Sequence, residues 1–352
     1  MNSTECSIQD TLNITEEEVS QWLYSSMETA IITVILPIDL GLCTLFNLIF
    51  LFVVFRVPET RSDTTIYLIH VAWADFLFNV SSVCFYLSTF IQSPVKGDQS
   101  ISHPVQCWLL ALSILTGYVT SIALVTMMSF ERYLALCHPL KHLKIRGRRR
   151  TLKIAGFCWL TGLACAVLEI PATAVRQRRC VRWPDEVTYQ MLPSSLSYCS
   201  PISPQVYQYT QLLILLPWFL SMFSSVYMYA RIIQVLSKRR EFNGRRETDR
   251  KAVQIRNQVA KMLIANGVVF FICHAPYIVL VFTIWFCRTA QIDNPLEGFV
   301  LTGGTWFMLL PQYVNTIVNP VIYGLTNREY RTAFFQAFHL KKASCTISPC
   351  QK

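Results

Sequence analysis

Residues 108–133 read WLLALSILTGYVTSIALVTMMSFERY. Trp108 to Phe130 form an apolar run long enough for a helix to cross a bilayer, and the triplet Glu131-Arg132-Tyr133 closes it. A charged pair at the mouth of a hydrophobic span is costly to desolvate. The triplet therefore indicates a function at one membrane boundary.

The rest of the chain repeats this apolar pattern. Hydrophobic residues make up 53% of the 352 residues and charged residues only 15%, against about a quarter in soluble domains. The sequence predicts an all-α membrane protein, a seven-transmembrane helix bundle. Pro276 interrupts the sixth span, and Gly303, Gly304 and Pro311 interrupt the seventh, which a bundle tolerates. The predicted spans cover about 30–55, 64–92, 105–135, 153–172, 206–236, 259–286 and 298–325.

Lysine and arginine predict the orientation. With the N-terminus outside, the inner segments hold 24 of these residues and the outer segments hold six, an excess that places the N-terminus outside and the C-terminus inside. The tail 1–29 would then be extracellular, with glycosylation sequons at Asn2 and Asn13. The basic residues are split among short loops, so the net charge of +10 reflects the membrane topology. The sequence predicts no surface that binds nucleic acid.

Two motifs carry a family resemblance. Glu131-Arg132-Tyr133 closes the third span and Asn319-Pro320-Val321-Ile322-Tyr323 closes the seventh. In this order and on these spans, they resemble the rhodopsin-like (class A) G-protein-coupled receptors over about residues 30–340. Further landmarks match the family in the first to seventh spans: Asn47, Asp75, Cys107, Trp159, Pro217, Pro276 and Asn315.

The resemblance implies a polar cluster inside the bundle. Asp75 in the second span, Ser121 in the third, and Asn315 and Asn319 in the seventh match positions that hold an allosteric sodium ion in the family. Oxygen ligands suit such a hard cation. The alternative is a hydrogen-bonded packing network without an ion. No other metal or cofactor is predicted.

The same resemblance assigns a switch to the inner end of the bundle. Glu131 would hold Arg132 in the resting state by a charge-assisted bond, and a released Arg132 would face a heterotrimeric G protein. Leu140, on the second inner loop, would contact the same partner, as would the region of Asn319, Pro320 and Tyr323. The alternative is an ion pair that only marks the end of the span.

The segment after the seventh span resembles the family's eighth helix. Tyr330, Phe334 and Phe338 recur every four residues, which predicts an amphipathic helix over 326–340 lying on the inner leaflet. Cys345 and Cys350, in the tail 341–352, are candidate palmitoylation sites. Arrestin is a further partner that the resemblance implies, at the plasma membrane.

The outer cysteines allow more than one pairing. The resemblance implies that Cys107 bridges to the second outer loop, where Cys199 is favoured and Cys180 is the alternative. If Cys6 pairs with Cys287, as in some relatives, one outer cysteine stays unpaired.

Two positions depart from the family pattern. His274 stands where the family usually has a tryptophan in the sixth span, and Ser225 stands where the fifth span often has a tyrosine. His274 would either titrate or bond to a ligand, or stay neutral and bond to a neighbouring helix. The activation details are expected to differ. The predicted ligand pocket holds apolar and aromatic side chains beside this histidine: Ile114, Leu115, Tyr118, His274, Tyr277 and Tyr313.

The sequence leaves three ligand classes open: an odorant-type small molecule, a peptide and a lipid. Ile114 replaces the aspartate of amine receptors, so an amine ligand is not expected. The stretch 127–142 and the pattern around Leu310-Pro311 resemble fish-type odorant receptors, which favours an odorant-type small molecule. The acidic N-terminal tail and the arginine-rich second outer loop favour a charged peptide instead, and a lipid is a further alternative.

Other classes of protein fit less well. A transporter is the main alternative, but no repeat relates the two halves of the chain. The polar residues inside the spans form neither a nucleophile and base pair nor a metal set, so no enzyme activity is predicted. Among these residues, Asp39 and Glu169 have no assigned role.

Overall fold

Long helices dominate the computed structural model, which describes residues 11–60, 62–242, 247–326 and 328–338. The long helices are α3 (Leu36–Arg56), α4 (Asp63–Gln92), α5 (Pro104–Cys137), α7 (Arg148–Glu169), α8 (Pro204–Phe242), α9 (Glu247–Ala290) and α11 (Thr305–Thr326). The short ones are α1 (Glu16–Trp22), α2 (Ser26–Ala30), α6 (Pro139–Ile145), α10 (Glu297–Leu301) and α12 (Arg328–Ala337). A π-helical turn (Ile31–Ile35) joins α2 to α3, and 3₁₀ turns occur at Pro58–Thr60, Ile170–Ala172 and Val187–Tyr189.

The prediction of seven helical spans is confirmed. In the described part of the chain, six helices are long and apolar enough to cross a membrane, and they correspond to the first six predicted spans. The seventh is α11, whose inward face carries several buried polar side chains: Gln312, Asn315, Thr316 and Asn319. These polar residues lower its apolar content, and two of them, Thr316 and Asn319, hydrogen-bond to α4 inside the bundle.

The predicted prolines do not interrupt the helices, whereas the predicted glycines do. α9 continues through Pro276, and α11 continues through Pro311 and Pro320, so these prolines do not end a helix. The seventh span is broken between α10 and α11, at the predicted Gly303 and Gly304. Gly303 there has a φ of +84°, a left-handed conformation that costs little only for glycine.

Local sequence explains where two of the central helices begin. The Ser62 hydroxyl accepts a hydrogen bond from the backbone N–H of Thr65 and caps α4. At α5, Pro104 occupies the first turn, and the Gln106 side chain accepts from the backbone N–H of His103. Both arrangements satisfy amide groups that a helix start leaves without a partner.

Small residues let the helices approach closely. A Cβ atom added at Gly117 of α5 would lie 2.8 Å from the Ala74 carbonyl oxygen of α4. One added at Gly162 of α7 would lie 2.8 Å from the Thr116 carbonyl oxygen of α5. Small residues at such contacts are typical of membrane helices. Large apolar side chains such as Phe157 and Leu220 point outward and are exposed, as expected for a surface covered by lipid.

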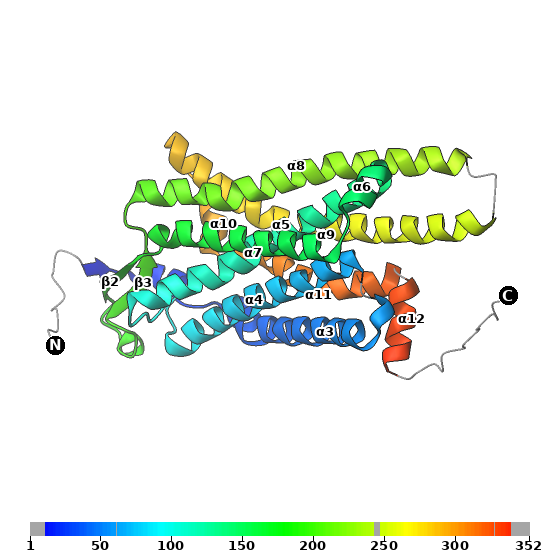
Figure 1. Ribbon diagram of the computed structural model, residues 1–352. Coiled ribbons are helices and arrows are strands. Elements are labelled where there is room, and N and C mark those ends of the chain that lie inside the picture. The colour runs from blue at the N-terminus through cyan, green and yellow to red at the C-terminus, as the bar shows by residue number, and fades with distance from the viewer. Residues whose placement is uncertain (1–10, 61, 243–246, 327, 339–352) are drawn as a thin grey trace.

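A three-stranded sheet covers one end of the bundle, which we call the sheet end (Figure 1). Strand β1 (Thr11–Asn13) pairs in parallel with β2 (Val175–Arg182), with Thr11 opposite Cys180. Strand β3 (Ser195–Ser200) pairs antiparallel with β2. Ile14, Val19 and Val181 belong to a small apolar cluster under this sheet. Residues 11–29, predicted as part of a tail, therefore fold against the loops at the sheet end.

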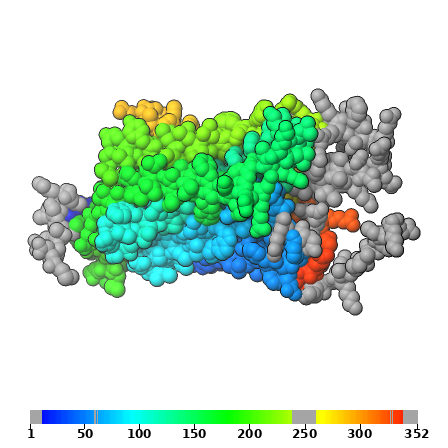
Figure 2. All heavy atoms as spheres, viewed as in Figure 1, coloured from blue at the N-terminus to red at the C-terminus, as the bar shows by residue number. Residues whose placement is uncertain are grey.

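The opposite end carries α12, and we call it the α12 end. Here α12 lies across the ends of the other helices, and α8 and α9 extend beyond the bundle (Figure 1). Ala333 and Ala337 of α12 pack on Val53 and Val57 at the end of α3, and the space-filling view shows the two segments in contact (Figure 2). The range of α12 lies within the predicted eighth helix.

Candidate functional site

A buried carboxylate joins three spans near the centre of the bundle. Asp75 of α4 accepts a hydrogen bond from the Ser121 hydroxyl of α5 at 2.8 Å and one from the Asn319 amide of α11 at 2.6 Å. All three side chains are buried. Two donors from two other helices stabilise a charge that would otherwise be costly at this depth.

Asn315 is the fourth residue of the predicted cluster. Its side chain is buried, but its Oδ1 has no hydrogen-bond partner, and it makes no bond to Asp75. The orphaned oxygen, the Asp75 carboxylate and the Ser121 hydroxyl are hard oxygen ligands of the kind that suits a hard cation. These residues fit the predicted sodium ion and would hold it by oxygen atoms alone.

A second polar network lies between α3, α4 and α11. The Asn79 amide donates to the Asp39 carboxylate at 2.7 Å and to the Thr316 hydroxyl at 2.9 Å. Asn47 donates to the Thr316 carbonyl oxygen at 3.1 Å. Asp39 had no assigned role in the sequence. The signal that marks this network is Asn79, an amide four residues after Asp75 and therefore one turn further along the same face.

The structure corrects the expected partner of Glu131. The carboxylate lies 2.8 Å from Arg150 and 3.6 Å from His142, and it accepts a longer bond from the Tyr67 hydroxyl at 3.4 Å. Among the described residues, it forms no salt bridge with Arg132. Adjacent helical positions diverge by about 100°, so Glu131 faces α4, α6 and α7 while Arg132 points elsewhere.

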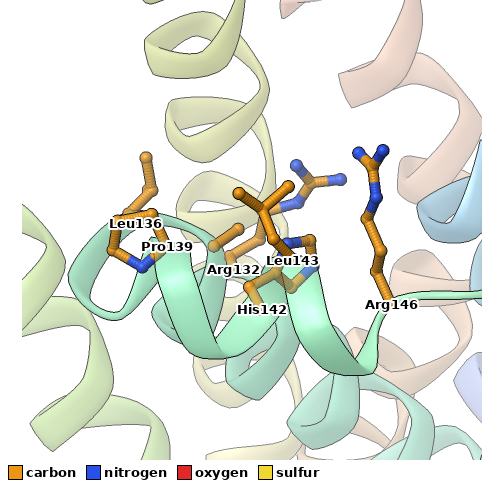
Figure 3. Close-up of a pocket in the computed structure, with 7 residues that line it drawn as sticks. Arg132, Leu136, Pro139, His142, Leu143 and Arg146 are labelled. Atoms are coloured by element: carbon orange, nitrogen blue, oxygen red, sulfur yellow. The ribbon is translucent and has the colours of Figure 1, made fainter.

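Arg132 instead lines a hollow at the α12 end. The cavity has a volume of about 230 Å³ and is lined by Arg132, Ala135, Leu136, Pro139, His142, Leu143 and Arg146. The side chains of Arg132 and Arg146 extend to the same side of α6 (Figure 3). The Arg132 Nε is buried and has no hydrogen-bond partner. The hollow therefore offers unsatisfied positive charge over an apolar floor.

His142 connects the two halves of this region, because it contacts Glu131 and also lines the hollow. Burial lowers the pKa of its imidazole, Glu131 raises the pKa, and Arg132, Arg146 and Arg150 lower it further. The net effect is a pKa below the ordinary value, so the site favours the neutral imidazole.

The remaining predicted switch residues divide into exposed and buried groups. Leu140 on α6 is 76% exposed, whereas Tyr323 is buried with no partner for its hydroxyl. The Tyr323 ring packs on Phe50 of α3. The Tyr133 hydroxyl hydrogen-bonds to His138 at 3.1 Å, and Pro320 lies within α11 directly after Asn319.

A tyrosine lies near the position where Ser225 replaces the family residue. Ser225 is fully buried, and one turn further along α8 the Tyr229 hydroxyl is 2.6 Å from the Ser129 hydroxyl of α5. Ser129 donates to the Val125 carbonyl oxygen, so Tyr229 is the donor to Ser129. A Cβ at Gly267 of α9 would lie 1.9 Å from the Tyr229 hydroxyl. Tyr229 thus joins α5, α8 and α9. Its partner on α5, Ser129, lies about one helical turn before Arg132.

Several predicted pocket residues come together around Phe78. The Tyr118 and Tyr313 rings pack on Phe78, and the Tyr118 ring lies 5.5 Å from the His274 ring. His274 is buried, and its Nδ1 donates to the Phe270 carbonyl oxygen at 2.8 Å. This bond stays within α9, where a bond to a neighbouring helix was one expectation. Leu115 is buried as well, while Ile114 and Tyr277 are half-buried.

Disulfides shape the sheet end. Cys107 is bonded to Cys199, and a disulfide also includes Cys180. Cys287 is a free, buried thiol, so it does not form the pair with Cys6 that the sequence had left open. Asn13 lies exposed on β1, as a glycosylation site must. The predicted sites at Asn2, Cys345 and Cys350 lie outside the described residues.

Comparison with known proteins gives a consistent set of relatives. A neuromedin U receptor homolog from Caenorhabditis elegans is 24% identical over 94% of this chain and 86% of its own length. A pineal opsin from Petromyzon marinus is 25% identical over 94% of this chain and 68% of its own. Neuromedin-U receptor 2 from Rattus norvegicus is 26% identical over 85% of this chain and 74% of its own.

The family model described as "7 transmembrane receptor (rhodopsin family)" matches residues 46–323. This range includes every long helix except the first part of α3 and the last three residues of α11, together with the polar cluster, the hollow and Tyr323. The chain therefore belongs to the rhodopsin family of seven-transmembrane receptors, and it is a membrane receptor rather than an enzyme.

Proposed function

We propose that this receptor binds a ligand at the sheet end, outside the cell, and activates a heterotrimeric G protein at the α12 end, in the plasma membrane. The excess of lysine and arginine in the segments at the α12 end supports this orientation. The ligand shifts a population between two arrangements of the helices. By linkage, the bound G protein raises the affinity for the agonist by the same factor.

The observation that carries this proposal is the state of Arg132. Its guanidinium is not paired with Glu131, its Nε has no partner, and it lines a hollow at the predicted cytoplasmic side. A protein partner that brings hydrogen-bond acceptors into this hollow satisfies the buried donor. Leu140, exposed on the neighbouring α6, offers an apolar contact to the same partner.

We favour a peptide over an odorant as the ligand. Four arginines lie exposed on β2 at the sheet end, at positions 176, 178, 179 and 182. Such a surface attracts acidic groups of a polymeric ligand and raises the rate of association. Two of the relatives described above are named as neuromedin U receptors. No comparable observation supports an odorant as the ligand.

The test is a screen of peptides, lipids and odorants in cells that report several G-protein pathways. Wild-type receptor should respond to a peptide. Arg132→Ala should lose at least tenfold in response at matched surface expression, because one desolvated charge contact contributes about 1.5–3 kcal/mol. Arg148→Ala, at an exposed position of α7, is the matched control and should respond as the wild type does.

Two results would count against the proposal. Equal signalling by wild type and Arg132→Ala would remove the assigned role of Arg132. Uptake of a labelled solute without any G-protein response would remove the receptor mechanism altogether. A response to an odorant alone would leave the receptor mechanism in place and reject the peptide ligand.

A further inference from the structure

A groove lies on the outside of the bundle where α3, α11 and α12 meet. Its volume is about 320 Å³, at the lower end of the range of about 300–1,000 Å³ typical of small-molecule sites. Ile49 of α3, Val321 and Gly324 of α11, and Arg331 and Phe334 of α12 are among the residues that line it. None of these residues belongs to the polar clusters or to the hollow beside Arg132.

The groove exists because two of its walls are kept apart. α12 is held at the end of α3 by the contacts of Ala333 and Ala337 with Val53 and Val57. On the α11 side, Gly324 presents no side chain, and a Cβ atom added there would meet nothing within 4 Å. A larger residue at 324 would therefore stand in the groove.

The lining of the groove is apolar apart from one charged side chain. Val321 and Phe335 are 39% and 37% exposed, and Leu325 beside the groove is 72% exposed. In a receptor that spans a membrane, apolar surface of this kind faces lipid. The groove therefore opens where acyl chains lie.

Arg331 fixes a positive charge at the polar end of the groove. Its Nη1 donates to the carbonyl oxygens of Gly324 at 3.3 Å and Leu325 at 2.6 Å, in the last turn of α11. These bonds hold the guanidinium in place and leave its Nε and Nη2 donors without a hydrogen bond to the described residues. Because α12 lies across the end of the bundle, this charge is at the depth of the headgroups.

We propose that the groove binds one anionic glycerophospholipid, with an acyl chain between α3 and α11 and its phosphate on the free donors of Arg331. The binding site rests on the membrane receptor fold and on the proposed orientation, which makes the α12 end face the anionic leaflet. It depends on neither the peptide nor the G protein.

The experiment uses the purified full-length receptor in a neutral detergent. Phosphatidylserine or phosphatidylcholine is added, and retained lipid is counted by native mass spectrometry. Wild type should retain one phosphatidylserine molecule. Gly324→Leu fills the groove and should weaken this binding at least tenfold. The matched control is Gly156→Leu at an exposed site on α7, where an added Cβ also meets nothing within 4 Å, and it should bind as the wild type does.

Variants of Arg331 test the headgroup contact. Arg331→Gln should lower the preference for phosphatidylserine over phosphatidylcholine about fivefold, the effect of one basic residue near an anionic surface. Arg331→Lys keeps the charge and should keep the preference. In the unsubstituted chain, phosphatidylserine with a photoreactive acyl chain should label segments around Ile49 and Phe334.

Four results overturn the proposal. The first three are retention of phosphatidylserine by a folded Gly324→Leu, labelling spread evenly over the lipid-facing helices, and full competition by a sterol. Binding that appears only after hydroxylamine cleaves thioesters also overturns it, because the groove would then hold an acyl group attached to the chain itself. A failed peptide screen would leave all of these measurements unaffected.

Discussion

At the scale of single residues, the two charges of Glu131-Arg132 have separate roles. Glu131 forms a salt bridge with Arg150 of α7 and lies 3.6 Å from His142 of α6, whereas Arg132 has an unsatisfied donor and lines the hollow. The acidic residue therefore fixes the position of the second inner loop, and the basic residue is left available to a partner. A helix separates the two functions simply by the rotation between successive residues.

The pairing of Glu131 with Arg150 can be measured by a double-mutant cycle. Glu131→Gln and Arg150→Gln should each destabilise the receptor, and their effects should fall short of additivity by about 1 kcal/mol, as expected for a partly exposed pair. Chemical denaturation in micelles provides the measurement. Arg149→Gln, at the exposed neighbouring position, should be additive with Glu131→Gln. Additivity in both cycles would contradict the pairing.

His142 should make the receptor less stable in mild acid. Its pKa is lowered mainly by burial, with Arg132, Arg146 and Arg150 acting in the same direction and Glu131 against them. A lowered pKa means that the fold favours the neutral imidazole, so this stabilisation is present above the ordinary pKa of about 6.5 and is lost as the pH falls below it. Thermal midpoints at pH 7.5 and 5.5 should differ less in His142→Gln than in wild type, and equal differences would reject this role.

At the scale of elements, Tyr229 connects helices whose ends the proposed mechanism moves apart. It reaches Ser129 on α5 and lies against Gly267 on α9. The family tyrosine expected at Ser225 is absent, and Tyr229 makes an interhelical contact one turn further along α8. The distance between α8 and α9 at this level is therefore set by a glycine and a hydroxyl group.

The contact between Tyr229 and Gly267 predicts that one substitution restores part of the stability lost through another. Gly267→Ala should destabilise the receptor by about 1–3 kcal/mol, because the new methyl group overlaps the Tyr229 hydroxyl and forces the helices apart. Tyr229→Phe removes that hydroxyl and should recover part of the loss in the double variant. Gly156→Ala meets no neighbour and should be neutral or slightly stabilising, since alanine favours helix. Denaturation midpoints provide the measurement. A double variant that is no more stable than Gly267→Ala alone would reject the contact.

At the scale of the whole molecule, apolar run length and loop charge were enough to predict the bundle. The break in the seventh span also fell at Gly303 and Gly304. Pro276 and Pro311 did not break their helices, because a packed bundle compensates for a lost backbone bond. The fold of residues 11–29 over the outer loops could not be predicted, since β1 pairs with a strand about 170 residues later.

In the candidate site, motifs predicted some of the residues, whereas other contacts depend on how the helices and loops fold together. Motifs selected Asp75, Ser121 and Asn319, which the structure brings together. The partners of Glu131 were missed, because Arg150 and His142 belong to a basic loop whose fold the motif does not specify. No motif selected Asn79, although its amide links Asp39 to Thr316.

Two buried carboxylates then allow a test of whether the central cluster holds a cation. Sodium chloride should raise the thermal midpoint of the purified receptor above its value in choline chloride at equal ionic strength. An ion at ten times its dissociation constant stabilises the folded state by about 1.4 kcal/mol, which corresponds to a shift of a few degrees.

Asp75→Asn should abolish this sodium effect, because it removes the charged ligand between α4, α5 and α11. Asp39→Asn is the matched control, since Asp39 is also buried but accepts its bond from Asn79 in the separate network. That variant should keep the sodium response. Loss of the response in both variants, or in neither, would show that the Asp75 cluster is a packing network rather than a cation site.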